Sequence, residues 1–136
     1  MASRKERLAF CFNAIGKEFK KGACESDFPK GFSIKDISVI TLLGDQPMMM
    51  GELAVELNLT PGTMTTKVDN LIKKKYVERA FDEEDRRKVY IQLTEHGVNI
   101  CSTIMGRHLD MAGLLLKKLD ASEQEIYVKL SEKLVS

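Results

Sequence analysis

TPGTMTTKVDNLIKKKYVERAFDEEDRRKVYIQLTEHG, residues 60–97, is the stretch of sequence that decides the fold. Thr60 followed by Pro61 is a helix-start signal, because the threonine side chain caps the first turn and proline suits the first helical position. Apolar residues then recur at helical spacing, and the period changes to two after Tyr76. Residues 60–97 therefore predict a helix followed by a two-stranded hairpin.

The helix predicted over residues 60–73 has an apolar face and a polar face. We expect its buried side to comprise Met64, Val68, Leu71 and Ile72. The opposite side carries small or hydrogen-bonding residues, which let a helix approach the major groove of DNA, and the helix start favours phosphate oxygens. The alternative is a threonine-rich surface helix that meets only solvent. We predict DNA contacts from Thr60, Gly62, Thr63, Thr65, Thr66, Lys67, Asn70 and Lys73.

The predicted hairpin, or wing, has a charged tip at residues 82–88. Three consecutive positive side chains, Arg86, Arg87 and Lys88, are expected there. Arginine gains from the enhanced negative potential of a narrow minor groove, so the wing is predicted to contact DNA. Phosphate would repel Asp85, which is therefore expected to hold an arginine in position. A charged turn without a partner is the alternative.

Helical periodicity also predicts three helices upstream of residue 60. The first contains an apolar stripe of Leu8, Phe12, Ile15 and Phe19. Ser33 can cap the second, and Asn58, which tolerates a left-handed conformation, can end the third. We expect these helices at residues 3–21, 33–44 and 50–57, with a loop at 22–31 and a turn at 45–47.

Two more helices are predicted after the hairpin. Thr94 can cap a long helix that runs to about Leu119, and Ser122 with Glu125 forms a possible capping box for the last helix. Two helices joined by a tight turn and followed by a hairpin form a winged helix-turn-helix. The expected fold is thus mainly α with a small β-hairpin wing.

Length and composition limit the possible functions. The 136 residues correspond to a single domain with 43% hydrophobic and 30% charged residues. The net charge is only +1, yet residues 60–81 hold five basic and two acidic side chains. Three widely spaced cysteines fit a reducing compartment, and no leader or membrane-spanning stretch is evident, so a cytoplasmic protein is expected. His96 and His108 form no ligand-spaced cluster, so neither a metal, a cofactor nor an enzyme is predicted.

Several short motifs occur in a characteristic order. They are Gly51-Glu52-Leu53-Ala54, residues 57–66, Val68-Asp69-Asn70-Leu71, Val77-Glu78-Arg79, Asp82-x-x-Asp85-Arg86-Arg87 and Leu93-Thr94-Glu95-x-Gly97. Together they resemble the multiple-antibiotic-resistance regulator (MarR) family. The resemblance implies a homodimer held by interlocked helices at about residues 3–21 and 94–135, with two winged lobes (about 33–93) that read a pseudo-palindromic operator.

By the same resemblance, Thr66 and its neighbours would face bases, Arg87 would enter the minor groove and Asp85 would brace it. Family members usually act as repressors modulated by a small molecule. Many members have arginine at the position of Thr66, a proline at that of Glu83 and a glycine at that of Lys75. A positive φ at Lys75 would cost on the order of 1 kcal/mol.

Other functions also remain possible from the sequence. Cys11 lies in the first predicted helix, where a redox-sensing branch of the family carries its reactive thiol. Residues 33–87 resemble the fatty-acid-synthesis repressor of streptococci, which implies an acylated corepressor. A winged helix can also bind a protein rather than DNA.

Overall fold

The computed structural model describes residues 1–22 and 31–136, which fall into two compact units. The helical unit comprises residues 1–22 and 106–136, and the winged unit comprises residues 31–105. The predicted loop at residues 22–31 falls mostly on residues 23–30, outside the described residues.

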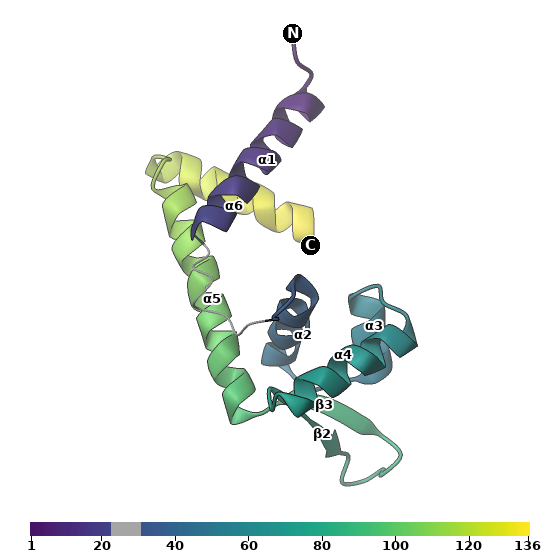
Figure 1. Ribbon diagram of the computed structural model, residues 1–136. Helices are drawn as coiled ribbons and strands as arrows, with labels where there is room; N and C mark the ends of the chain where they lie inside the picture. Colours follow the sequence, from purple (N-terminus) through teal and green to yellow (C-terminus); the bar gives the residue numbers. More distant parts are fainter. Residues whose placement is uncertain (23–30) are drawn as a thin grey trace. The chain divides into compact units, whose positions relative to one another are not determined.

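The winged unit contains helices, a wing formed by β2 and β3, and the beginning of a long helix (Figure 1). Its elements are α2 (Ile34–Asp45), β1 (Met48–Met49), α3 (Met50–Glu56), α4 (Pro61–Lys73), β2 (Val77–Phe81), β3 (Val89–Leu93) and the start of α5 (Glu95–Leu116). The antiparallel sheet has the order β1-β3-β2, and β2 and β3 form the wing. The predicted fold, mainly α with a small winged hairpin, is confirmed.

Strand β1 was not predicted from the sequence. Met48 pairs with Ile91 and Met49 pairs with Tyr90, so this two-residue strand covers the second edge of β3. Two residues are too few to show alternation, and their conformation depends on the distant partner strand.

Local signals set both ends of α4. Thr60 Oγ1 accepts a hydrogen bond from the Thr63 amide at 3.2 Å, and Pro61 is the first helical residue, as predicted. At the other end, Lys75 adopts φ 64°. The Lys75 amide donates to the Ile72 carbonyl, and the Tyr76 amide donates to the Leu71 carbonyl. This is a Schellman motif with lysine in the position that glycine usually occupies.

The turn before α4 is built in the same way. Asn58 has φ 51°, so its predicted left-handed conformation is confirmed. The Leu59 amide donates to the Ala54 carbonyl at 2.9 Å. Both turns pack around one core to which every element of the winged unit contributes. Its fully buried side chains include Val39, Ile40, Leu53, Met64, Val68, Leu71, Val77, Ile91 and Ile104.

The helical unit combines α1 (Arg4–Gly22), the end of α5 and α6 (Ala121–Val135). Two predictions here are wrong: α5 ends at Leu116 rather than near Leu119, and α6 is capped by Asp120 with Glu123 rather than by Ser122 with Glu125. The side chains of Asp120 and Glu123 each accept the other's backbone amide, at 2.9 and 3.0 Å.

The side chain of Gln124 joins the start of α6 to the end of α5. Its side-chain amide donates to the carbonyls of Leu116 and Leu119, at 2.9 and 3.1 Å, and so satisfies the end of α5. The tight connection places Asp120 at the helix start. Among the described residues, none of the helices has the length and apolarity needed to cross a membrane.

Candidate nucleic-acid interface

Helix α4 has an exposed polar face and a buried apolar face. Met64, Val68 and Leu71 are buried, as predicted. The exposed residues include most of the predicted DNA contacts: Thr60, Gly62, Thr63, Thr65, Thr66, Asn70 and Lys73. One contiguous helical surface therefore carries them, beginning at the helix N-terminus, where backbone N–H groups favour anions.

The hydroxyls of Thr65 and Thr66 on this surface already have acceptors inside the chain. Thr65 Oγ1 donates to the Pro61 carbonyl at 2.9 Å, and Thr66 Oγ1 donates to the Gly62 carbonyl at 3.1 Å. The lone pairs and methyl groups remain for a partner. Hydroxyl lone pairs can accept from the amino groups of adenine or cytosine, and threonine methyl groups can contact thymine methyls.

Gly62 has open space around it. A Cβ atom added there would meet no other heavy atom within 4 Å, so packing inside the chain does not require glycine. The missing side chain leaves the first turn of α4 accessible to an approaching backbone or base.

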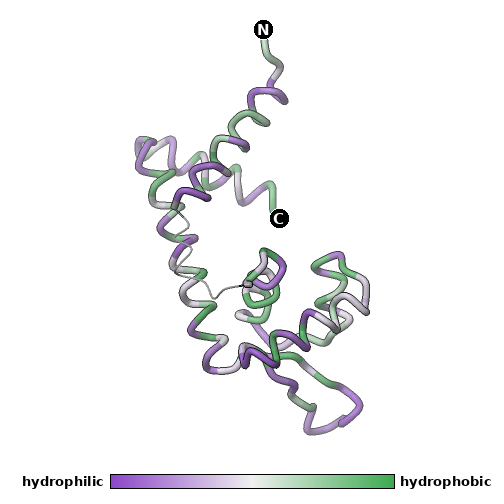
Figure 2. Tube along the Cα trace, in the orientation of Figure 1, coloured by the Kyte–Doolittle hydropathy of each residue, from purple (hydrophilic) through white to green (hydrophobic). Residues whose placement is uncertain are grey.

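The wing tip is a turn that is coloured hydrophilic in Figure 2. Asp82 Oδ1 accepts from the amides of Glu84 and Asp85, at 2.8 and 3.3 Å, and the Lys88 amide donates to the Asp85 carbonyl. Arg86, Arg87 and Lys88 are all exposed. The turn therefore holds the cationic segment away from the core, and the organising role of Asp82 was not predicted.

Asp85 contacts Arg87 twice. Its Oδ1 atom accepts from both the backbone amide and the Nε of Arg87, each at 3.1 Å. The side chain of Arg87 nevertheless keeps 91% of its area exposed. The pair orients the guanidinium while leaving it accessible, although an exposed pair contributes under about 1 kcal/mol to stability.

Two other ion pairs anchor α4 and were missed by the sequence analysis. Arg79 of β2 reaches Asp69 at 2.9 Å, and Lys67 reaches Asp36 of α2 at 3.1 Å. Lys67, one of the predicted DNA contacts, is thus half-buried and engaged within the chain. Ser33 and Asp36 match the S-x-x-D form of a capping box, but nothing in the sequence pairs Asp36 with a lysine 31 residues away.

The two described cysteines differ in environment. Cys11 is exposed on α1, whereas Cys101 is partly buried. Burial, together with the negative charge of Asp45, raises the pKa of the Cys101 thiol, which disfavours the reactive thiolate. Among residues 1–22 and 31–136 there is no cluster of three potential metal ligands from His, Cys, Asp and Glu.

Known proteins are similar to this chain in both sequence and fold. The model of the MarR family matches residues 30–88. SarZ of Staphylococcus aureus (strain MRSA252), an HTH-type transcriptional regulator, is 30% identical over 102 residues, which cover 73% of this chain and 68% of SarZ. YhbI of Bacillus subtilis (strain 168), an uncharacterized HTH-type transcriptional regulator, is 34% identical over 82 residues, which cover 60% of this chain and only 53% of YhbI.

A solved structure, Streptococcus pneumoniae FabT in complex with DNA, aligns with a TM-score of 0.75 and 29% identity. The alignment covers 96% of this chain and 92% of FabT.

Proposed function

The chain belongs to the MarR family, and from this premise we propose that it is a transcription regulator that binds double-stranded DNA. The observation that carries the proposal is the exposed face of α4 combined with the wing on which Asp85 holds Arg87. Helix α4 would enter the major groove and Arg87 the minor groove. FabT, which is similar over nearly its whole length, was solved in complex with DNA, and this supports the assignment.

The DNA contacts within this proposal come from two elements. On α4 and its cap they are Thr60, Gly62, Thr63, Thr65, Thr66, Asn70 and Lys73, and on the wing they are Arg86, Arg87 and Lys88. A regulator of this kind acts in the cytoplasm, where bacterial DNA lies. Repression by promoter occlusion and modulation by a small molecule are the modes that the family leads us to expect.

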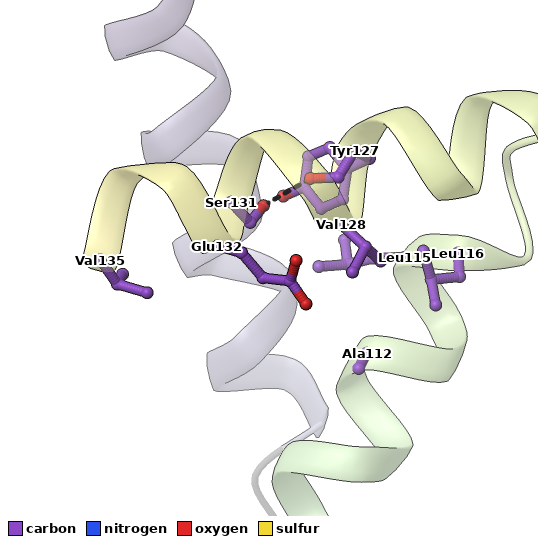
Figure 3. A pocket seen from close by; sticks show the side chains of 8 residues that line it. All are labelled: Ala112, Leu115, Leu116, Tyr127, Val128, Ser131, Glu132 and Val135. Atoms are coloured by element: carbon purple, nitrogen blue, oxygen red, sulfur yellow. Dashed lines mark hydrogen bonds between the residues drawn. The ribbon is translucent and has the colours of Figure 1, made fainter.

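Homodimerisation is part of the same proposal, and the exposed apolar side chains support it. These include Leu8, Phe10, Phe12 and Phe19 on α1 and Ile126, Leu130 and Leu134 on α6. Between α5 and α6 lies a cavity of about 320 Å³, lined mainly by apolar side chains such as Leu115, Val128 and Val135 (Figure 3). Extensive exposed apolar surface marks an interface, and a second copy would place two wings on one pseudo-palindrome.

Selection of bound duplexes from a random pool tests this function. We expect enrichment of a pseudo-palindrome with half-sites about 10 base pairs apart, and binding that weakens steeply with salt. Failure to enrich any sequence, with binding that does not depend on salt, would instead favour a winged helix that docks on a protein.

A further inference from the structure

Lys67 forms the least exposed ion pair among the described residues. Its Nζ lies 3.1 Å from Asp36 Oδ1 and 3.2 Å from Ser33 Oγ. The side chains of Lys67 and Asp36 are only 22% and 10% exposed, whereas the pairs formed by Arg79 and Arg87 lie at the surface. Lys67 belongs to α4, while Ser33 and Asp36 form the start of α2. The contact thus ties two helices together.

Asp36 divides its two carboxylate oxygens between two tasks. Oδ2 accepts from the Ser33 amide at 2.8 Å and closes the capping box of α2, while Oδ1 accepts from Lys67. Burial alone would raise the pKa of Asp36, but the Ser33 and Lys67 hydrogen bonds outweigh it, and the pKa is lowered. The carboxylate is therefore charged near neutral pH and needs its cationic partner.

Lys67 occupies a position on α4 from which its ion pair can resist rotation of the helix. Thr63 and Asn70 lie four residues before and three residues after it, so the three share one side of the helix. Met64 and Leu71, at the opposite offsets of three and four, are buried. Lys67 therefore lies at the boundary between the polar face and the core, where a tether resists rotation of α4 about its axis.

We propose that Lys67 is a positioning residue, which fixes the orientation of the DNA-contacting face of α4 by pairing with Asp36, rather than a phosphate contact. The proposal rests on the DNA-binding function above and replaces the sequence-based prediction for Lys67. Two of the three N–H donors of Lys67 Nζ are already engaged by Ser33 and Asp36. Extending the ammonium group outward to a phosphate would leave Asp36 as a partly buried charge without its partner, which is unfavourable.

Binding of the selected duplex across a salt series distinguishes the two roles. The variants are Lys67→Met, Asp36→Asn and, as the matched control, Lys73→Met, which removes an exposed lysine from the same helix. We expect Lys67→Met and Asp36→Asn each to weaken binding roughly tenfold, and the double variant to lose little more. The slope of log affinity against log salt should stay unchanged in Lys67→Met and become shallower by about 1.8 in Lys73→Met, because a bound homodimer loses two lysines.

A phosphate-contact role makes the opposite prediction. Asp36→Asn would then free Lys67 and tighten binding, and Lys67→Met would make the salt slope shallower by about 1.8 for the two copies in a homodimer. Either result overturns the proposal. All variants are compared at temperatures where circular dichroism shows them to be folded, so that loss of the fold does not imitate loss of positioning.

A second readout does not depend on DNA. Hydrogen exchange of the α4 amides should be faster in Lys67→Met and in Asp36→Asn than in the wild type or Lys73→Met, because the tether is lost. If the wild type binds no duplex, the proposed function fails. The hydrogen-exchange rates of the α4 amides then decide alone whether Lys67 holds α4 in position. Unchanged exchange in α4 would then overturn the positioning role.

Discussion

The Nε atom of Arg87 lies 3.1 Å from Oδ1 of Asp85, at the tip of the wing. An acidic side chain beside a DNA-binding arginine would weaken binding if it acted only by its charge. Because it instead orients Arg87, we predict that Asp85→Ala, which removes the accepting oxygen, weakens operator binding. The matched control, Glu84→Ala, removes an equal charge from the same turn and should leave affinity equal or higher. Tighter binding by Asp85→Ala would contradict the bracing role.

Arg87→Ala should weaken operator binding roughly 10- to 100-fold, since it removes a desolvated charge from the minor groove. Fluorescence anisotropy with the selected duplex measures this. Full affinity in this variant would show that the wing does not contact DNA as proposed.

Gly97→Ala should destabilise the winged unit. A Cβ atom added at Gly97 would collide with the Tyr76 carbonyl oxygen, which already accepts from the Thr94 amide at 3.1 Å. We expect a loss of about 2–3 kcal/mol in the free energy of unfolding, measured by urea denaturation. Gly51→Ala, at an open position of α3, is the control and should lose nothing.

Gly62→Ala separates stability from binding. The added methyl group meets nothing inside the chain, and alanine favours helix, so stability should stay equal or rise by up to about 1 kcal/mol. Operator affinity should fall, because the methyl group occupies the surface that faces the groove. If affinity is unchanged, the first turn of α4 does not approach the DNA closely.

Asp36 should contribute to the pH dependence of stability. Its pKa is lower in the folded chain than its ordinary value of 3.8, so its stabilising contribution is full above that pH and is lost as the pH falls through the folded-state pKa. Asp36→Asn should therefore lose less stability than the wild type on acidification below about pH 4. Urea denaturation of the wild type and Asp36→Asn between pH 2 and 7 measures this. Equal losses of unfolding free energy in the two proteins on acidification would contradict the prediction.

Leu130→Glu should shift the protein toward monomers. Leu130 is 57% exposed on α6, among the apolar side chains assigned to the dimer interface. We expect sedimentation velocity to show at least a tenfold weaker self-association, because a charge would be buried at that interface. Val55→Glu is the control, since Val55 is 80% exposed on α3 of the winged unit. Equal self-association of both variants would place the interface elsewhere.

Features encoded by residues close together could be predicted from the sequence alone. The Thr60 cap, the left-handed Asn58 and the alternation of β3 each depend on neighbours within a few residues, so the winged fold and most of the exposed α4 surface followed from pattern. Local reasoning was weaker where two signals compete, as at Asp120 and Ser122, because each could start a helix.

Tertiary structure alone decided the remaining features. Strand β1 is defined by its pairing with the edge of β3, and the helix start at Asp120 is accompanied by a hydrogen bond from the Gln124 side chain to the Leu116 carbonyl at the end of α5. Lys67 stands between exposed Thr66 and buried Val68 in the sequence, and packing brings its ammonium group to Asp36, 31 residues away. Sequence spacing gives the face of a helix on which a side chain lies, whereas the partner it meets depends on how distant elements pack.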